Sequence, residues 1–454
     1  MRLYALEVAA LAAGLAGAGA AMDAGWSHAN GRPPASTGVR FPPGDDAETI
    51  VFPVTFGLLI STDAGESFRW VCEDAIGYSG MFDPDYAVTA GGTLYANSHQ
   101  GLRVSDDGGC TWRTIGGALS GDPFISEVEV GPDGRVWVAT ANGGAPNDVY
   151  VSSDGESFAS ANLAATDSWW VSLRTTPADP ERIYVSGFQP QGGDVPESAL
   201  LRRSGDGGES WDELPVDDFT FGQEADLLLA GVSPTDPDVV FARAAQAVAN
   251  SGDVLYRSGD GGETWEQVAA FADTLSAFLI RPDGKTVIAG SVRACPEDIG
   301  DGGVPVHGCV RISRDGGVTW ERAAEEPRLA CIGERSDGVL FGCGANFDPD
   351  NFALGRSDDG ETWDAVFHFE ETAGPLACPT DSAQAECALA TWPTQCEALG
   401  ACPRGGGDPA GDDEGGGDGG CCRVGGETGG SLLPVAAVVL VFWLARRRRA
   451  GPKT

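Results

Sequence analysis

The chain has 454 residues, of which 66 are Gly and 28 are Pro. Together they make up 94 of 454 residues, about a fifth, whereas their usual combined share is about an eighth. Because 42% of the residues are hydrophobic, a sizeable core is possible. A chain that is rich in turn residues and can still bury a core favours many short strands over long helices. With 67 acidic and 29 basic residues the net charge is −38, which argues against a nucleic-acid partner. We attribute the acidity to solubility, with a calcium-binding surface as the weaker alternative.

The N-terminus has the features of a secretory signal peptide over residues 1–20. Arg2 precedes an apolar stretch that ends in Ala18-Gly19-Ala20, a small-x-small cleavage pattern. Residues 21–44 are then expected to form a linker. The protein is therefore predicted to be exported.

Seven copies of a short motif follow, of the form Ser-x-Asp-x-Gly-x-Thr-Trp. Their closing aromatic residues stand at positions 68, 112, 158, 211, 265, 320 and 363, at intervals of 43 to 55 residues. The motif aspartates are Asp63, Asp107, Asp154, Asp206, Asp260, Asp315 and Asp359, and the closing tryptophans are Trp112, Trp211, Trp265, Trp320 and Trp363. A repeat of this period indicates a stack or ring of similar units.

Each unit carries the pattern of four short strands. A β-rich run precedes each motif, two further runs flank a Pro/Asp/Gly turn, and a fourth run follows the motif. The first unit offers only residues 49–54 and 57–60 before its motif. The predicted fold class is all-β: a seven-bladed β-propeller of four-stranded antiparallel blades over residues 45–372.

The motif resembles the Asp-box (BNR) repeat of sialidases, sortilin-type receptors, xyloglucan-degrading enzymes and photosystem assembly factors. The resemblance implies that each motif is a hairpin turn between the third and fourth strands, away from the central channel. The aspartates would then cap backbone amides and the aromatic residues would pack within the blade. We expect a structural role for all seven motifs, no cofactor, and calcium binding only as the minor alternative.

Ten of the twelve cysteines are expected to form disulfides in an oxidising compartment. Their spacing suggests three hairpin pairs: Cys295 with Cys309, Cys331 with Cys343, and Cys378 with Cys387. We expect the Cys-rich residues 373–403 to return to the first blade and supply strand material that closes the ring. A separate disulfide-bonded appendix is the alternative.

The C-terminal region consists of a Gly/Asp-rich spacer over residues 404–420, then Cys421 and Cys422, an apolar segment and an arginine cluster. This arrangement resembles the C-terminal sorting signal of myxobacterial surface proteins. The resemblance implies processing near the two cysteines and retention at the cell surface or outer membrane, with a membrane contact through this tail. An ordinary single-span anchor is the alternative.

The sequence does not single out catalytic residues. Arg40 stands in Val-Arg-Phe-Pro, an altered form of a sialidase motif, and we expect it to be a linker residue rather than a catalytic one. Tyr150 and Tyr256 precede motifs on structural strands, and Trp169-Trp170 is expected to pack between blades rather than line a sugar-binding cleft. We therefore predict a monomeric, surface-retained module that binds or scaffolds a glycan or protein.

A glycoside hydrolase, sialidase-like or polysaccharide-degrading, is the alternative function. The feature that separates the two is whether carboxylates and arginines converge at the channel with perturbed acidity.

Overall fold

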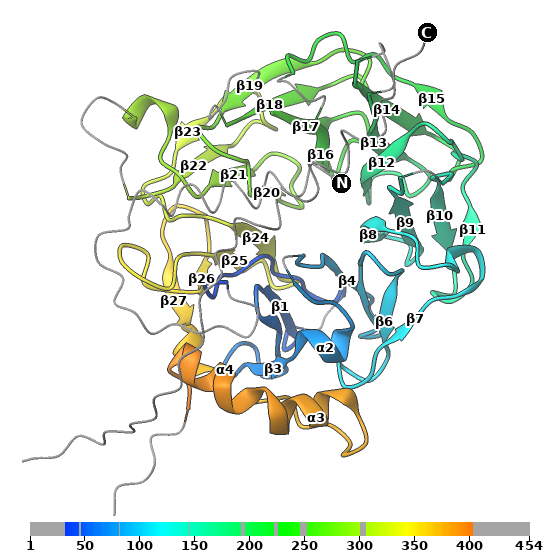
Figure 1. Ribbon diagram of the computed structural model, residues 1–454. Helices are drawn as coiled ribbons and strands as arrows, with labels where there is room; N and C mark the ends of the chain where they lie inside the picture. The colour runs from blue at the N-terminus through cyan, green and yellow to red at the C-terminus, as the bar shows by residue number, and fades with distance from the viewer. Residues whose placement is uncertain are drawn as a thin grey trace, which may run out of the picture. The chain divides into compact units, whose positions relative to one another are not determined.

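The computed structural model describes residues 32–402, except 45–46, 81, 144, 192–195, 222–225, 246–251 and 300–305. The predicted signal peptide, the spacer, the sorting signal and Cys421/Cys422 lie outside the described residues. Within them the chain forms seven antiparallel sheets arranged as the blades of a propeller around a central axis (Figure 1). The predicted fold class is thus confirmed.

Six blades are four-stranded sheets in which the strands follow one another from the axis to the rim. Blade two contains β4 (Tyr86–Val88), β5 (Leu94–Ala96), β6 (Arg103–Ser105) and β7 (Arg113–Thr114), and blade three contains β8 (Ile125–Val130), β9 (Val136–Thr140), β10 (Val149–Ser152) and β11 (Ala159–Ser160). Blade four contains β12 (Trp169–Thr175), β13 (Ile183–Gln189), β14 (Ser198–Ser204) and β15 (Asp212–Glu213), and blade five contains β16 (Leu227–Val232), β17 (Val240–Ala245), β18 (Asp253–Ser258) and β19 (Glu266–Ala270). Blade six contains β20 (Ala277–Ile280), β21 (Val287–Ser291), β22 (Cys309–Ser313) and β23 (Glu321–Arg322), and blade seven contains β24 (Cys331–Glu334), β25 (Leu340–Cys343), β26 (Leu354–Ser357) and β27 (Asp364–Phe367).

Blade one is built from β1 (Ile50–Val54), β2 (Gly57–Ser61) and β3 (Arg69–Val71), with an inner segment from further upstream. Arg40 and Val51 exchange two backbone hydrogen bonds of 2.8 and 2.9 Å, and Ser36 is bridged to Val54. Residues 36–40 therefore occupy the position of an innermost strand. The prediction of a linker was wrong for this segment. Residues 36–40 form only a short run between two Pro-containing stretches, so the sequence gives little sign that they pair with β1.

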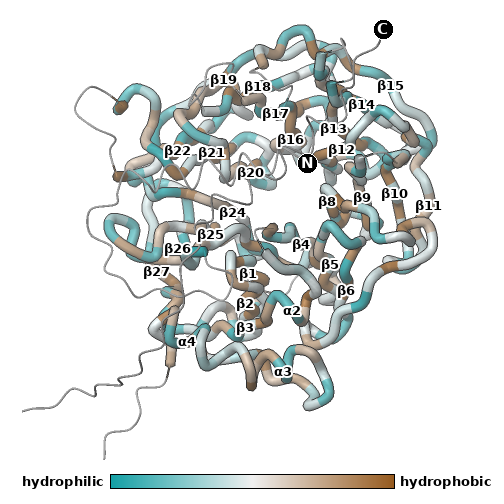
Figure 2. The backbone as a smooth tube through the Cα atoms, viewed as in Figure 1, coloured by the Kyte–Doolittle hydropathy of each residue, from teal (hydrophilic) through white to brown (hydrophobic). Residues whose placement is uncertain are grey.

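Burial explains why these runs become strands. The second strands are apolar on both faces, as in β9, where all five residues are buried, because each blade packs against two neighbours. The outermost strands are short and exposed, as in β15, where both residues are charged. The hydropathy colouring shows the same trend, with hydrophilic stretches along the outer rim (Figure 2).

The seven Asp-box motifs form the turns between the third and fourth strands of their blades. In blade five the Asp260 Oδ1 accepts from the Ser258 hydroxyl at 2.8 Å and the Thr264 amide at 2.9 Å, while Oδ2 accepts from the Thr264 hydroxyl at 2.6 Å. The same Ser–Asp contact recurs in all seven motifs. These hydrogen bonds hold the carboxylate inside the turn and lower the pKa of Asp260.

The turns also join neighbouring blades. Gly262 adopts a φ of +92°, and a Cβ there would lie 2.7 Å from Leu214 of blade four, so only glycine fits. Trp265 is 6% exposed and its ring lies 5.0 Å from that of Phe219, which precedes blade five. The motif aromatics therefore pack against the preceding blade.

Short helices complete the fold: α2 (Glu73–Ile76), α3 (Ala383–Ala390), α4 (Trp392–Leu399), and the 3₁₀ turns η1 (Gly117–Leu119), η2 (Pro296–Asp298) and η3 (Phe369–Glu371). Figure 1 places α3 and α4 at the outer side of blade one. We call residues 373–402, which contain both of these α-helices, the C-terminal clasp. No helix in the described part of the chain is long and apolar enough to cross a bilayer.

The clasp closes the ring from outside blade one. The Trp70 amide donates to Gly374 O at 2.9 Å and the Leu376 amide to Trp70 O at 2.8 Å, so residues 374–376 run parallel to β3. The buried side chain of Gln384 continues this pairing, accepting from the Cys72 amide at 2.9 Å and donating to Trp70 O at 2.7 Å. The returning chain thus does pair with blade one, but on its outer edge, while the inner strand comes from the N-terminal side.

Disulfides fix the clasp to two blades. Cys387 is bonded to Cys72 beside β3, and Cys378 is bonded to Cys110 in the Asp-box of blade two. The predicted Cys378–Cys387 pair was therefore wrong, because these residues belong to a helical clasp rather than to a hairpin.

The other three disulfides are local. Cys295–Cys309 and Cys331–Cys343 form as the spacing indicated, with Cys331 and Cys343 opposite each other on β24 and β25. Cys396 and Cys402 form a bond within the clasp.

Candidate functional site in the central channel

A cavity of about 280 Å³ lies between the innermost segments of the blades. One part of its lining is charged and comes from blades one to four: Arg40, Asp85, Glu127 and Arg174. The rest comes mainly from blades five to seven and mixes apolar and polar residues: Leu229, Ala230, Arg243, Leu275, Ser276, Phe278, Cys331 and Ile332. We call the four charged residues the polar wall. The surface that the whole cavity offers to a molecule within it is predominantly polar.

The centre of the polar wall is an ion-pair cluster between β8 and β12. The Arg174 guanidinium donates to Glu127 Oε2 at 3.1 Å and lies 3.6 Å from Glu129 Oε2. Glu129 also accepts from the amide and hydroxyl of Thr175, at 2.6 and 2.5 Å. Glu129 thus connects blades three and four through these contacts, whereas Glu127 lines the cavity.

The acidity of Glu127 is strongly perturbed. Burial is the main cause that raises the pKa of Glu127 to about 7; the charge of Arg174 opposes the rise, and those of Asp85 and Glu129 add to it. Burial also raises the pKa of Glu129, against the hydrogen bonds that it accepts from Thr175. Near neutral pH a substantial fraction of Glu127 is therefore a carboxylic acid that can donate a proton.

Asp85 and Arg40 form the more open part of the polar wall. The Arg40 guanidinium lies 3.7 Å from Asp85 Oδ1, and its Nε donates to Tyr86 O at 3.0 Å. The Asp85 side chain is 54% exposed, compared with 15% for that of Glu127. Arg40 thus contributes to the channel across the junction of blades one and two, which corrects its interpretation as a linker residue.

The remaining wall combines one further charge with an aromatic ring. Arg243 is paired with the buried Asp253 at 2.5 Å, and Asp253 also accepts from the Leu275 amide at 2.9 Å. Phe278 is partly buried, and its ring lies 5.2 Å from that of Phe241.

Of the residues considered in the sequence, only Arg40 and the disulfide-bonded Cys331 line this cavity. The Asp-box residues lie in the turns before the outermost strands, Tyr150 lies on β10, and the Tyr256 hydroxyl accepts from the Thr220 amide at 3.1 Å. The sequence analysis missed Asp85, Glu127 and Arg174. A signal existed in β8, where two glutamates alternate with valines on an innermost strand, but it required the blade register to be known.

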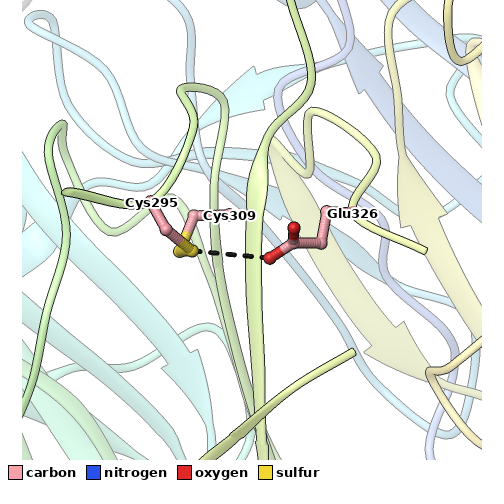
Figure 3. A group of neighbouring side chains, drawn as sticks. All are labelled: Cys295, Cys309 and Glu326. Atoms are coloured by element: carbon pink, nitrogen blue, oxygen red, sulfur yellow. Dashed lines mark hydrogen bonds between the residues drawn. A yellow bond between two sulfur atoms is a disulfide. The ribbon is translucent and has the colours of Figure 1, made fainter. Parts of the chain in front are cut away.

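Two groups in the described part of the chain have their potential metal-ligand atoms close together, and both contain Glu326. In one, Oε1 of Glu326 lies 3.4 Å from the Sγ of Cys295, but Cys295 and Cys309 form a disulfide and offer no thiolate (Figure 3). In the other, with Asp298 and His307, the Arg322 guanidinium already pairs with both carboxylates. Neither group includes an Asp-box aspartate or a residue of the channel.

The fold defines the class of the protein: a seven-bladed β-propeller in which each blade carries a turn held by a Ser–Asp hydrogen bond. No protein-family model matches the chain. The xyloglucanase Xgh74A of Acetivibrio thermocellus is 26% identical over 174 residues, a match that covers 35% of this chain and 20% of that protein. The chain thus matches only about a fifth of the length of this curated relative.

Several solved structures align with much of the chain at low sequence identity. The Niastella koreensis GH74 enzyme aligns with a TM-score of 0.42 at 16% identity, over 76% of this chain and 66% of that chain. YCF48 from Cyanidioschyzon merolae aligns with a TM-score of 0.42 at 14% identity, over 70% and 96%. YCF48 bound to D1 peptide aligns with a TM-score of 0.44 at 13% identity, over the same shares.

Proposed function

We propose that this protein is an exported glycoside hydrolase, retained at the cell surface, that acts on a glycan whose end enters the central channel. The observation that carries the proposal is Glu127, a carboxyl group with a pKa of about 7 that lines the cavity with Asp85. Glycoside hydrolysis commonly uses one protonated and one ionised carboxyl group. The five disulfides support export to an oxidising compartment.

The two carboxyl groups would divide the reaction between them. Glu127 would donate its proton to the oxygen of the scissile glycosidic bond, so that the leaving sugar departs as an alcohol. Asp85, at the more exposed part of the wall, would either attack the anomeric carbon or activate the water that does so. Arg174 would orient Glu127, and Arg40, 3.7 Å from Asp85 Oδ1, would orient Asp85.

The cavity also limits the substrate. Its volume of about 280 Å³ is at the lower end of the range for ligand pockets, so it would hold a chain end rather than a long segment. The predominantly polar lining would receive the hydroxyl groups of a sugar unit. The partial similarity to a xyloglucanase supports a neutral polysaccharide as the first substrate to test.

The test is hydrolysis by the full-length protein of xyloglucan, a β-glucan and small aryl glycosides. We expect Glu127→Gln to lower turnover by at least about a hundredfold, which is the usual contribution of a general acid. Glu266→Gln, on the exposed start of β19, is the matched control and should leave turnover unchanged. Glycan binding without turnover in the wild-type protein would contradict the proposal and favour the binding function.

A further inference from the structure

We propose that Trp169 is a sugar-stacking platform on the rim of the channel, and that its ligand is an uncharged polysaccharide chain. This inference rests on the proposed function, because the chain would extend from a sugar unit held in the channel. It assigns a role to one of two adjacent tryptophans that the structure separates. It also gives the substrate class: a polymer rather than a free monosaccharide or a short glycoside.

The two adjacent tryptophans have different environments. Trp170 is 2% exposed, and its Nε1 donates to Leu163 O at 3.1 Å, so it packs in the core between the blades as expected from the sequence. Trp169 is only partly buried. Core packing therefore explains Trp170 and leaves part of the Trp169 ring accessible.

The Trp169 ring is held in place by its neighbours. It lies 5.3 Å from the ring of Phe188, its partner across β12 and β13. On the adjacent blade, a Cβ added to Gly143 would lie 3.4 Å from Cζ2 of Trp169. An aromatic ring that is fixed before binding loses little conformational entropy when a sugar stacks on it.

The position of Trp169 connects it to the channel. It is the first residue of β12, the innermost strand of blade four. Arg174 of the polar wall lies five residues further along the same strand. At about 3.3 Å per residue the two positions are separated by roughly 16 Å. A ligand that reaches both sites is therefore longer than the channel cavity can hold, which requires a chain of several sugar units.

A polar pair lies next to the platform in sequence, and an aromatic pair lies beside the innermost strand of the preceding blade. Gln189 Nε2 donates to Asp167 Oδ2 at 3.3 Å, and these two residues flank the Trp169–Phe188 pair in sequence. At the neighbouring innermost strand, the exposed ring of His99 stacks on Phe124 at 4.4 Å, and Phe124 directly precedes β8. The amide of Gln189 and the carboxylate of Asp167 can receive hydroxyl groups of a sugar that stacks on Trp169.

The charge of the protein determines which polysaccharide fits. A net charge of −38 repels polyanions such as uronic acid or sulfated polymers, whereas a neutral chain experiences no such repulsion. We therefore infer a neutral polysaccharide.

The experiment is affinity electrophoresis of the full-length protein in gels that contain xyloglucan, a mixed-linkage β-glucan or carboxymethyl cellulose. We expect Trp169→Ala to weaken binding to at least one of the two neutral polymers about tenfold, and Trp169→Phe to restore most of it. Phe347→Ala, which removes a 58% exposed aromatic ring on blade seven, is the control and should bind as the wild type does. Unchanged binding by folded Trp169→Ala, or tighter binding of carboxymethyl cellulose than of the neutral polymers, would overturn the inference.

Hydrolysis distinguishes this inference from the proposed function. In an active protein, Trp169→Ala should raise the KM for the polymer and leave the hydrolysis of a small aryl glycoside unchanged. If no glycoside is hydrolysed but Trp169→Ala still loses the polymer, the platform stands and the hydrolase proposal fails. If turnover is present and Trp169→Ala affects the polymer and the small glycoside equally, the hydrolase stands and the platform is rejected.

Discussion

The disulfides of the clasp offer a quantitative test of how this ring is closed. Cys72–Cys387 and Cys110–Cys378 span 315 and 268 residues, so each alone would close almost the whole propeller. With Cys72–Cys387 intact, the second bond closes only a residual loop given by the difference of the two separations, which is 47 residues. The chain-entropy relation gives about 4 kcal/mol for a loop of that size.

We therefore expect Cys110→Ser/Cys378→Ser to lose about 4 kcal/mol of stability. Unfolding entropy is about 2.1 cal/mol/K per residue, so for the roughly 370 residues of the propeller and clasp the melting temperature should fall by about 5 °C. Differential scanning calorimetry of the oxidised protein measures this shift. The pair Cys396→Ser/Cys402→Ser, which opens a loop of only six residues, is the control and should lose about 2 kcal/mol.

Two results would refute this reasoning. Equal shifts for both double variants would show that loop length does not control the stabilisation. A wild-type melting temperature for Cys110→Ser/Cys378→Ser would show that the backbone pairing of residues 374–376 and the Gln384 hydrogen bonds close the ring without the bond to blade two.

Three further predictions concern the channel and the blades. Activity should decline above about pH 7 as Glu127 loses its proton. Because Arg174 lowers the pKa of Glu127, Arg174→Met should move this decline in the pH–rate profile to higher pH. An unshifted profile would argue against Glu127 as the acid. Trp265→Ala should cost about 3–5 kcal/mol in urea unfolding, whereas Trp320→Ala, at a more exposed ring, should cost less, and equal costs would contradict the assigned packing. The hydrogen bonds in the Asp-box turn lower the pKa of Asp315 to about 2, so its contribution to stability should be complete above about pH 4 and be lost as the pH falls towards 2. Asp315→Asn should therefore flatten this part of the curve of stability against pH, and an unchanged curve would contradict this assignment.

The sequence was sufficient for the ring of blades because the blades are repeated. Seven Asp-box motifs establish both the number of blades and the position of one turn in each, and the apolar alternation then places the remaining strands. The non-repeated parts were predicted less well. Residues 36–40 have no motif, and their role as an inner strand depends on pairing with Val51. The clasp cysteines were paired by proximity in sequence, whereas their partners lie about 300 residues away.

The channel was hidden from the sequence for a related reason. Its charged wall takes single residues from four blades, and 67 carboxylates offer no way to choose Asp85 and Glu127 from the sequence alone. From the sequence, we expected a hydrolase to differ from a binding module by carboxylates and arginines that converge at the channel with perturbed acidity. The structure meets this expectation, with Glu127 at a pKa of about 7 beside Arg174, and this favours the alternative function over simple binding.

Ring closure and the site are connected at the junction of blades one and two. Arg40 comes from the inner segment of blade one and Asp85 from the start of blade two, so their 3.7 Å contact depends on how these two blades meet. The clasp bonds to the same two blades, through Cys72 and Cys110, on the side away from the axis. A covalent connection at the rim therefore restricts the relative motion of the two blades whose inner residues form the open part of the charged wall. The Arg40–Asp85 pair thus lies between two blades that the clasp connects covalently at their rims.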